Sequence, residues 1–378
     1  MEFIADIASN HNSDISTLFE LIDACSKSGV TCVKLQSFKA SKLVSNSGFN
    51  SLGKTGTHQD KWKESVFESY KKAETPLEWL EKSFSECEKK GLKLMTSPYD
   101  EISLKDSLKY IDGIKIGSGD IDNDPILDVA FKTKLPIYIA TGASDFKDIQ
   151  VTMNKYEKIR SNFSNISIMQ CNTNYTANRS MSASEFAHQY MNINLSVLSK
   201  FKKYFKNAKL GLSDHTITFD SALIASICFD AVCIEKHFTL DYSQKGQDHA
   251  FSLNPEEWYE MVKVIKKCKK ISEKLSSFDE KLELCLDNCQ LPEIAKLLIG
   301  DGVKKIQENE LQSSIVQRRG IVINKNLNKN HIIKKEDICF LRPRPKDSFS
   351  PREINSVLNK KLNTCLNEGD NILKHHIE

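Results

Sequence analysis

The sequence predicts a (β/α)8 barrel of the TIM type followed by a small β-rich module. Short apolar runs alternate with amphipathic helical segments along residues 1–270, and eight such runs are what a closed parallel barrel requires. Near-continuous apolar runs are typical of parallel strands that are covered on both faces. A doubly wound open sheet is the alternative fold, but no G-x-G-x-x-G motif follows any of the runs, and that motif marks the dinucleotide-binding form of such sheets.

Each predicted strand is a short, mainly apolar run that ends in polar or turn-forming residues. The eight runs are Phe3–Ala8, Thr31–Gln36, Leu92–Ser97, Gly113–Gly117, Leu135–Ala140, Ile166–Cys171, Ala208–Leu212 and Ala231–Ile234.

Helix-start signals lie between the runs. Thr75-Pro76-Leu77-Glu78 offers an N-cap, a proline at the first helical position and a reciprocal capping glutamate. Asn254-Pro255-Glu256-Glu257 repeats this pattern, and apolar residues then follow at helical spacing. Residues 219–227 show the same spacing between the last two strands. Helices are therefore expected between successive strands.

The chain divides into three expected parts. Residues 1–270 form the barrel, and residues 271–312 form a Lys/Glu-rich helical insertion that ends in a linker, IGDGVKKIQENE. Residues 313–378 form the β-rich module, because short β-branched runs there are split by Asn/Lys turns.

Composition excludes several function classes. The 53 basic and 50 acidic residues leave a net charge of only +3, which implies no nucleic-acid or acidic-membrane partner. No apolar run approaches the roughly 20 residues that span a bilayer, and the N-terminus lacks the features of a signal peptide. The 11 cysteines therefore favour a reducing compartment, and we expect a cytoplasmic protein. Cys285 and Cys289 lie four apart with no second Cys/His pair near them, so a zinc site there is not favoured.

Two lysines within apolar runs indicate an anion site. The carboxyl ends of the strands build the active site of a TIM barrel, and Lys34 and Lys115 lie near two such ends. An inward lysine is costly unless it is paired. Alternation places Lys34 on the face of Gln36 and Lys115 on the face of Gly117, close to Ser and Thr hydroxyls. This pattern predicts a site for an anion, with phosphate as the favoured group.

Two histidines follow the last two runs, His215 in GLSDHT and His237 in IEKHFTLD. A single histidine at a strand end is more often a hydrogen-bonded structural residue. Two of them on adjacent strands, however, can meet at the mouth of the barrel. Imidazole suits several divalent metals, and two nitrogen ligands leave positions open, as a catalytic site requires.

With these strand ends aligned, the chain resembles the sialic acid (N-acetylneuraminate) synthase family from about residue 3 to the C-terminus. The terminal module resembles the antifreeze-like (SAF) domain that these synthases carry. The matching segments are ADIASNHNSD, VKLQSFKASKLVS, LMTSPYD, GIKIGSGDIDNDPIL, ATGAS, QCNTNY, GLSDHT, IEKHFTLD, KGQDHAFSLNPEE, IGDG, QRRGIVINKNL and LRP.

The resemblance implies a reaction and a set of site residues. The family condenses phosphoenolpyruvate with an open-chain N-acylated hexose, typically N-acetylmannosamine, and releases phosphate. His215 and His237 would hold Mn²⁺ or Mg²⁺. Arg342 of LRP would reach the partner subunit's site in a domain-swapped homodimer and contact the N-acyl group. Phosphoenolpyruvate would be held by Lys34, Lys115, Ser97, Ser118 and Ser213, and the substrate site would include Thr173, Tyr175 and Asp248.

The chain departs from the family pattern at several of these positions. Asp6 and Asp120 replace glutamates, of which the first handles the metal-bound water and the second holds the sugar. Ala140 replaces a serine and Thr176 replaces a proline. Aspartate shortens the reach by roughly one C–C bond, and a misplacement on the order of 1 Å can cost 10²-fold in rate. These departures leave the acyl-sugar open.

Three alternatives follow from the same residues. The first is a legionaminic or pseudaminic acid synthase, which performs the same chemistry on a different deoxy-sugar. The second is a catalytically weakened homologue that acts as a binding protein, which the two aspartates motivate. The third is a metal-dependent aldolase on a similar barrel, which would leave the terminal module unexplained.

Overall fold

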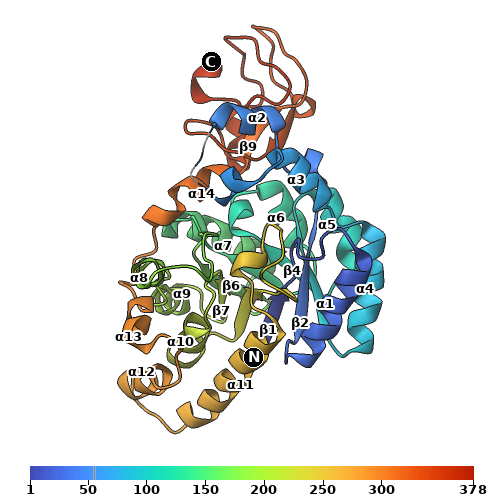
Figure 1. Ribbon diagram of the computed structural model, residues 1–378. Helices are drawn as coiled ribbons and strands as arrows, with labels where there is room; N and C mark the ends of the chain where they lie inside the picture. Colours follow the sequence, from blue (N-terminus) through green and yellow to red (C-terminus); the bar gives the residue numbers. More distant parts are fainter. Residues whose placement is uncertain (54, 56) are drawn as a thin grey trace.

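A computed structural model of the protein describes residues 1–53, 55 and 57–378. Within these residues eight parallel strands pair in chain order, and β8 pairs with β1 to close the barrel (Figure 1). The predicted (β/α)8 barrel is confirmed, and the open-sheet alternative is wrong. The strands are β1 (Glu2–Asp6), β2 (Cys32–Ser37), β3 (Lys93–Pro98), β4 (Gly113–Ile116), β5 (Ile137–Ala140), β6 (Ile166–Cys171), β7 (Lys209–Asp214) and β8 (Cys233–His237).

The last two strands run further than the sequence predicts. The apolar pattern ends at Leu212 and Ile234, whereas the strands continue to Asp214 and His237. Polar residues can extend a parallel ladder where their side chains find partners near the barrel mouth. The histidine-bearing segments are therefore held by the sheet itself and do not lie in free loops.

The interior of the barrel changes from apolar to polar along the strand direction. A buried apolar layer lies deep in the barrel, formed by Ile4, Cys32, Met95, Tyr138, Met169 and Cys233. Residues two positions further along a strand point to the same side, and here they include Asp6, Lys34, Ser97, Lys115 and Glu235, all at most 4% exposed. A polar layer thus stands on an apolar floor at the carboxyl end of the barrel.

Helices surround the barrel, and α11 begins as the sequence predicts. Asn254 caps α11 through a reciprocal pair with Glu257. The expected N-cap at Thr75 is wrong, because Pro76 takes that position and the Thr75 hydroxyl instead lies 3.3 Å from Nε2 of His11. The helices are α1 (Ile15–Lys27), α2 (Asn46–Leu52), α3 (Val66–Lys72), α4 (Leu77–Lys89), α5 (Glu101–Ser107), α6 (Asp124–Ala130), α7 (Phe146–Arg160), α8 (Ala183–Met191), α9 (Val197–Tyr204), α10 (Asp220–Cys228), α11 (Pro255–Ser272), α12 (Phe278–Leu286), α13 (Pro292–Ala295) and α14 (Leu311–Val316).

The insertion after α11 covers a hydrophobic helix of the barrel. Residues 220–227 of α10 are all buried, so this helix has no solvent face. A helix that is apolar around its whole circumference needs cover on every side. Both α11 and α12 pack against α10 and supply this cover.

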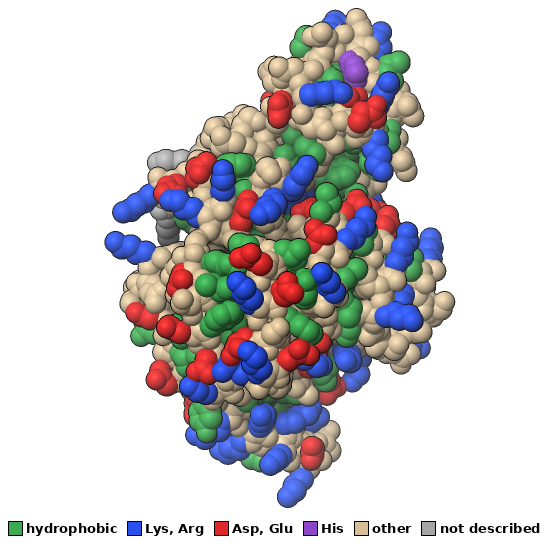
Figure 2. All heavy atoms as spheres, turned by 90° about the vertical axis from the view of Figure 1, so that its right-hand side faces the viewer, with side chains coloured by type: hydrophobic (Ala, Val, Ile, Leu, Met, Phe, Trp, Pro, Cys, Tyr) green, Lys and Arg blue, Asp and Glu red, His purple; other side chains and the backbone are tan. Residues whose placement is uncertain are grey.

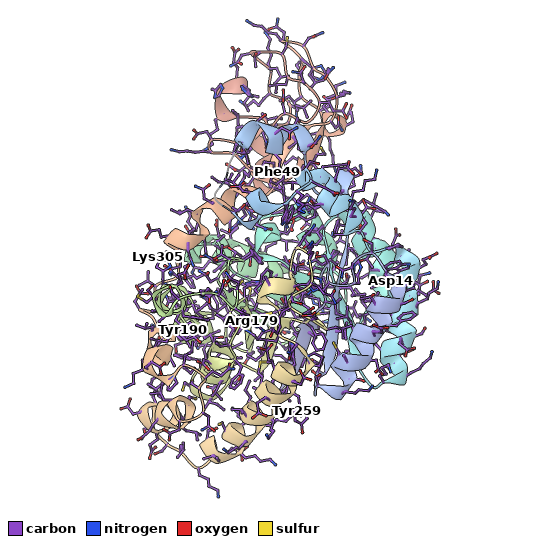
Figure 3. All side chains as sticks on the ribbon, viewed as in Figure 1. Asp14, Phe49, Arg179, Tyr190, Tyr259 and Lys305 are labelled. Carbon is purple, nitrogen blue, oxygen red and sulfur yellow. The ribbon has the colours of Figure 1, made fainter. Side chains whose placement is uncertain are left out.

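The terminal module lies over the carboxyl ends of the barrel strands (Figure 1). Its two-stranded antiparallel sheet pairs β9 (Gly320–Ile323) with β10 (Ile338–Leu341), and a separate apolar core supports it. In Figure 3, Phe49 of α2 lies where the barrel loops meet the module, whereas Asp14, which caps α1, lies on the outer surface. Phe49 packs in a small cluster that includes Val316 of α14, so apolar contacts help to dock the module.

Ion pairs also fix the module to the loop after β4. Arg318 and Arg344 both pair with Asp122, at 2.9 and 2.5 Å, and Arg352 pairs with Asp124 at 3.1 Å. Glycine at position 119 permits this approach, because a Cβ there would lie 2.2 Å from the carbonyl oxygen of Gln317.

The surface mixes charges of both signs. Figure 2 shows Lys and Arg side chains interspersed with Asp and Glu over the face that α1, α4 and α5 form, with small apolar areas between them. Among the helices of the described residues, none is long and apolar enough to cross a membrane.

Candidate active site

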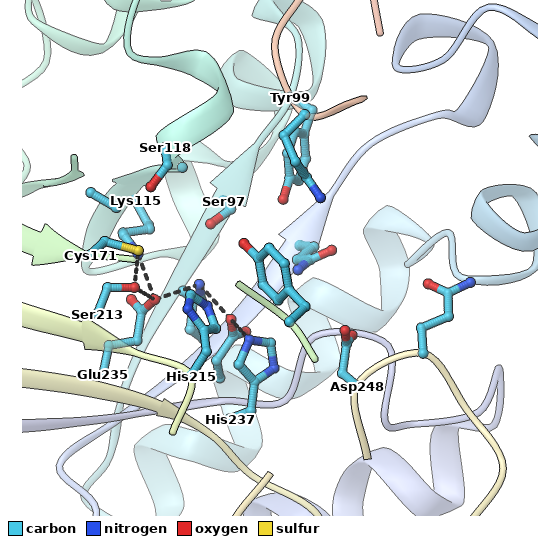
Figure 4. Close-up of a pocket in the computed structure, with 18 of the residues that line it drawn as sticks. Ser97, Tyr99, Lys115, Ser118, Cys171, Ser213, His215, Glu235, His237 and Asp248 are labelled. Atoms are coloured by element: carbon cyan, nitrogen blue, oxygen red, sulfur yellow. Dashed lines mark hydrogen bonds and ion pairs between the residues drawn. The ribbon is translucent and has the colours of Figure 1, made fainter. Parts of the chain in front are cut away.

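A pocket opens at the carboxyl end of the barrel, below the terminal module. Strand ends from all parts of the barrel line it, together with side chains from the loops and the module (Figure 4). It includes most of the residues that the sequence predicts for the site, namely Asp6, Lys34, Ser97, Lys115, Ser118, Tyr175, Ser213, His215, His237, Asp248 and Arg342.

Two buried lysines converge on one carboxylate in this pocket. Oε1 of Glu235 lies 2.5 Å from Nζ of Lys115 and 3.0 Å from Nζ of Lys34. Nζ of Lys34 also lies 2.6 Å from Oδ2 of Asp6. The predicted inward lysines are confirmed, and each is paired, as the desolvation cost of a buried cation requires.

The two lysines differ in how far nearby carboxylates offset the cost of burying their positive charge. Burial acts to lower the pKa of Lys34, but Asp6 and Glu235 outweigh it and raise that pKa above its usual value. Burial, together with the like charge of Lys34, lowers the pKa of Lys115, and Glu235 offsets this only in part. Burial would raise the pKa of Glu235, but the two lysines hold it well below its usual range. Of these two lysines, Lys115 is therefore the one that gains more from an added anion.

Serine hydroxyls line the pocket on the side of Lys115 (Figure 4). Oγ of Ser213 donates to Glu235 and lies 3.4 Å from Nζ of Lys115. Ser118 accepts a hydrogen bond from the backbone N–H of Gly142 at 2.9 Å, and a Cβ at Gly142 would lie 3.0 Å from that hydroxyl. Serine hydroxyls and a lysine are suitable donors for phosphate or carboxylate oxygens.

The two predicted histidines lie side by side in the same pocket. Their ring centroids are 5.5 Å apart, and both residues are buried. Nδ1 of His215 lies 3.0 Å from the carbonyl oxygen of Asn172, so the ring donates there and Nε2 keeps its lone pair. Burial and the neighbouring His237 lower the pKa of His215 to about 3. The imidazole of His215 is thus neutral near pH 7, which is the form that binds metals.

These residues fit a divalent metal with an open coordination sphere. Nδ1 of His237 is buried and has no hydrogen-bond partner, and its Nε2 lies 3.5 Å from Oδ2 of Asp6. Among the residues described here, no group of three or more His, Cys, Asp or Glu side chains is arranged to hold a metal. The protein would therefore supply two imidazoles, and the other positions would remain for water and substrate, as in catalytic sites.

A second buried ion pair lies directly behind the histidines. Nζ of Lys236 lies 2.5 Å from Oδ2 of Asp214 and donates to the carbonyl oxygen of Thr216 at 2.7 Å. Asp214 and Lys236 directly precede His215 and His237, so their side chains point to the opposite side of the sheet. The ion pair therefore links the two strands at the positions next to the histidines. From α11, Trp258 Nε1 donates to the carbonyl oxygen of His237 at 3.2 Å.

Arg342 enters the pocket of its own chain. Backbone hydrogen bonds with Leu43 and Ser45 fix it, and its side chain lies 3.3 Å from the Tyr70 hydroxyl. The sequence led us to expect this arginine in the partner's site, but within one chain the module already covers its own barrel. Nε of Arg342 is buried without a hydrogen-bond partner, so it has one donor left for a ligand.

Asp120 does not line the pocket, although the sequence predicts it there. Its carboxylate lies 2.5 Å from Nε of Arg319 and 3.5 Å from Nη2 of Arg342. The shorter aspartate side chain ends in these two guanidinium groups. In this structure Asp120 anchors Arg319 and Arg342, of which Arg342 lines the pocket, and its expected contact with the sugar stays a prediction.

Thr173 is not among the residues that line the pocket, and its role in binding substrate stays a prediction. Its side chain is buried beside Gly142, and its hydroxyl donates to Glu310 of the linker at 3.1 Å. Tyr175 and Asp248 do line the pocket. The ring centroids of Tyr175 and His215 lie 4.4 Å apart. Asp248 accepts a hydrogen bond from the Ser9 hydroxyl at 2.7 Å.

Comparison with known protein families identifies this arrangement. The model of the NeuB family matches residues 21–276, which is more than half of the chain. The chain belongs to the NeuB family. The matched range contains both lysines, both histidines and Glu235.

Curated relatives cover nearly the whole chain. A N,N'-diacetyllegionaminic acid synthase of Legionella pneumophila is 29% identical and aligns with 99% of this chain and 94% of its own length. A pseudaminic acid synthase of Helicobacter pylori is 26% identical over 100% of this chain and 98% of its own length. The N-acetylneuraminate-9-phosphate synthase of Drosophila melanogaster is also 26% identical, over 99% and 95%. This NeuB-family chain is thus similar to synthases of several different acidic sugars.

Solved structures show the same fold. The spore coat polysaccharide biosynthesis protein SpsE of Bacillus subtilis superimposes with a TM-score of 0.73 at 24% identity, covering 100% of this chain and 95% of its own. The N-acetylneuraminic acid synthetase of Leptospira borgpetersenii gives 0.59 at 22% identity, covering 74% and 90%. The first match includes the terminal module of this NeuB-family protein.

Several residues of the NeuB-family pocket escape the sequence prediction. Glu235 is not among the predicted site residues, because the predicted strand ends one residue before it. Extending the alternation of β8 from Cys233 would have placed Glu235 and His237 inside the barrel. Tyr99, which also lines the pocket, and Arg319, which pairs with Asp120 outside its lining, gave no comparable signal, because their contacts depend on how the module docks.

Proposed function

We propose that this protein is a nonulosonate synthase that condenses phosphoenolpyruvate with an open-chain N-acylated hexose, giving a nine-carbon 2-keto acid and phosphate. One observation carries the proposal: a single pocket combines two buried lysines that share Glu235 with two histidines that fit a metal. The family membership and the synthases among the relatives support the same reaction.

The lysine half of the pocket would bind phosphoenolpyruvate. This substrate carries a phosphate and a carboxylate, and Lys115 is the cation least compensated by its neighbours. Ser97, Ser118 and Ser213 line the same side of the pocket and supply hydroxyl donors. These groups would fix the enol carbon toward the histidine half, and orientation of this kind lowers the barrier for a reaction between two substrates.

The histidine half would bind the sugar aldehyde. Mn²⁺ or Mg²⁺ held by His215 and His237 would act as a Lewis acid on the aldehyde oxygen. Tyr175 packs against His215 and would close the pocket on this side. The trapped aldehyde carbon would then face carbon 3 of phosphoenolpyruvate.

The bond changes follow from these positions. The electron pair of the C2–C3 π bond of phosphoenolpyruvate forms the bond from carbon 3 to the aldehyde carbon. The C=O π bond of the aldehyde breaks, its oxygen takes up a proton to become a hydroxyl group, and water adds to carbon 2. The tetrahedral carbon then expels phosphate by breaking its C–O bond, which leaves a 2-keto acid. Asp6 lies between Lys34 and His237, at 2.6 and 3.5 Å, and would accept the proton of the attacking water.

The terminal module would complete the sugar site. Arg342 keeps one buried donor, and an acyl carbonyl oxygen is a suitable acceptor for it. Two copies that exchange modules would make the same contacts between chains, so a domain-swapped homodimer of antifreeze-like modules remains part of the proposal. We place the enzyme in the cytoplasm, because all its cysteines have free thiols.

A legionaminic acid-type synthase is the second candidate. Two of the aligned relatives are N,N'-diacetyllegionaminic acid synthases, at 29% and 28% identity. Both candidates use phosphoenolpyruvate in the same way. The first would take N-acetylmannosamine as the hexose, and the second would take a 2,4-diacetamido-trideoxyhexose.

Release of phosphate tests the proposal. Purified protein with Mn²⁺ and phosphoenolpyruvate would be given N-acetylmannosamine or a 2,4-diacetamido-trideoxyhexose, with glucose as the control sugar. We expect release that depends on one of the acylated hexoses. The absence of any sugar-dependent phosphate release would refute the proposal and favour the binding-protein alternative.

A further inference from the structure

The linker between the barrel and the module makes specific contacts with the loop that follows β6. We propose that Glu310 and Asn309 are positioning residues, which hold this loop and, through Asn172, orient the imidazole of His215. The inference rests on the proposed function and extends it, because it assigns a role at the metal site to residues of the linker.

Glu310 is a fully buried carboxylate without a direct ion pair in the described structure. Its Oε1 accepts hydrogen bonds from the backbone N–H of Ala143 at 2.8 Å and of Thr173 at 2.8 Å, and from the Thr173 hydroxyl. Its Oε2 accepts from the N–H of Gln307 at 3.1 Å. Burial of a charge is costly unless hydrogen bonds replace its hydration. Glu310 meets this need by joining the loops after β5 and β6.

Asn309 extends the same contact toward the pocket. Its side-chain amide and that of Asn172 form a reciprocal pair, at 3.0 and 3.1 Å. The backbone carbonyl oxygen of Asn172 in turn accepts the hydrogen bond from Nδ1 of His215. A short chain of contacts therefore runs from the linker to the ring that would bind the metal. Such outer partners fix the tautomer and orientation of a ligating histidine.

Two more side chains hold the neighbouring backbone, one from the linker and one from α14 at the start of the module. Nζ of the buried linker residue Lys304 lies 3.5 Å from the carbonyl oxygen of Cys171, and the Ser313 hydroxyl of α14 donates to the carbonyl oxygen of Thr173 at 2.7 Å. Three successive residues, 171–173, are thus each contacted by the linker. Arg318 of the module donates to the carbonyl oxygen of Ala143 at 2.8 Å, so module docking and loop position are joined at one residue.

The test compares Glu310→Ala and Asn309→Ala with Glu308→Ala, whose carboxylate is exposed in the same short 3-10 helix (Glu308–Glu310). Imidazole ¹⁵N signals of the metal-free protein would be recorded first, then Mn²⁺ affinity and steady-state kinetics. We expect Glu310→Ala and Asn309→Ala to shift or broaden the His215 signals and to weaken Mn²⁺ binding or kcat about 10- to 100-fold. The KM for phosphoenolpyruvate should stay within about threefold, because Lys34 and Lys115 lie on other strands. Glu310→Gln should restore much of the loss, because its amide oxygen can still accept the Ala143 and Thr173 hydrogen bonds.

The inference is overturned if both alanine variants match Glu308→Ala in the His215 signals and in Mn²⁺ affinity. If Glu310→Ala fails to fold, Asn309→Ala decides, since it removes only the amide pair. A wild-type protein that releases no phosphate would refute the proposed function alone. The His215 signals would then still support or overturn the positioning role, because they need neither substrate nor turnover.

Discussion

Nζ of Lys115 lies 2.5 Å from Oε1 of Glu235, and that same oxygen lies 3.0 Å from Nζ of Lys34. One carboxylate oxygen thus bridges two buried ammonium groups in the pocket. Lys34 has Asp6 as a second anion at 2.6 Å, whereas among the described residues Lys115 pairs with the shared Glu235 alone. Lys115 is therefore the lysine with less compensation and the better placed to bind an anionic ligand.

Replacement of Lys115 by methionine should weaken binding of phosphoenolpyruvate. Truncating one partner of a buried charged contact costs roughly 2–5 kcal/mol, so we expect KM for phosphoenolpyruvate to rise at least about 30-fold, with a smaller change in KM for the sugar. Steady-state kinetics with each substrate varied in turn would measure this. Lys209→Met, at the opposite end of β7, is the matched control. Equal effects of Lys115→Met on both KM values would contradict the assignment.

Removal of either pocket histidine should abolish turnover and metal binding. His215→Ala and His237→Ala each delete one of the two imidazoles that fit the metal. Isothermal titration with Mn²⁺ would report the lost affinity independently of activity. His331→Ala, in the terminal module, is the control and should bind Mn²⁺ normally. Undiminished Mn²⁺ binding in either pocket variant would show that the metal lies elsewhere.

Lengthening Asp120 to glutamate should change sugar selection. The extra methylene would push the carboxylate against Arg319, which lies 2.5 Å away, and would displace Arg342. We expect the KM for the acylated hexose to change about tenfold or more, with little effect on phosphoenolpyruvate. An Asp120→Glu enzyme with wild-type KM and sugar preference would argue against the anchoring role of Asp120.

Breaking the ion pair behind the histidines should destabilise the protein. Lys236→Met leaves Asp214 buried without its cation, and loss of one partner of a buried pair costs about 3–5 kcal/mol. Urea unfolding of the apo protein would give the free energy of unfolding. Lys266→Met, on the exposed face of α11, should leave it unchanged. A Lys236→Met loss no larger than that of the control would mean that the pair contributes little.

Stability should fall on acidification, in part because of His11. Burial, opposed only in part by Asp248, lowers the pKa of His11 to about 4. Between that value and its ordinary pKa of 6.5 the unfolded chain binds a proton that the folded chain does not, so stability decreases as pH falls through this window. The full effect is about 3 kcal/mol. His11→Gln should make the dependence of the unfolding free energy on pH shallower between 6.5 and 4, with His215 supplying part of the remaining slope because its pKa is also lowered, and an unchanged slope would refute the assignment.

The barrel was predictable because its signals are local. Apolar runs and helix starts such as Asn254 depend only on neighbouring residues. The inward lysines were also predictable, since a cation in an apolar run needs a partner. Glu235 was missed because the predicted strand ends with the apolar run at Ile234, whereas β8 continues through the polar layer to His237.

The contacts with the terminal module were not predictable in this way. The sequence predicts that Thr173 and Asp120 contact the substrate. In the folded chain the Thr173 hydroxyl donates to Glu310, and the Asp120 carboxylate pairs with Arg319. Both partners are distant in sequence, and no local pattern connects them. The same holds for Arg342, whose position depends on which barrel its module covers.

The most direct test of the account follows the bridging oxygen of phosphoenolpyruvate. The enzyme would be given [2-¹⁸O]phosphoenolpyruvate, Mn²⁺ and the acylated hexose that supports turnover, and both products would be analysed by mass spectrometry. We predict a nine-carbon 2-keto acid, with the ¹⁸O label in the released phosphate. A label retained in the keto acid, or the absence of any nine-carbon product from the acylated hexoses, would contradict the account.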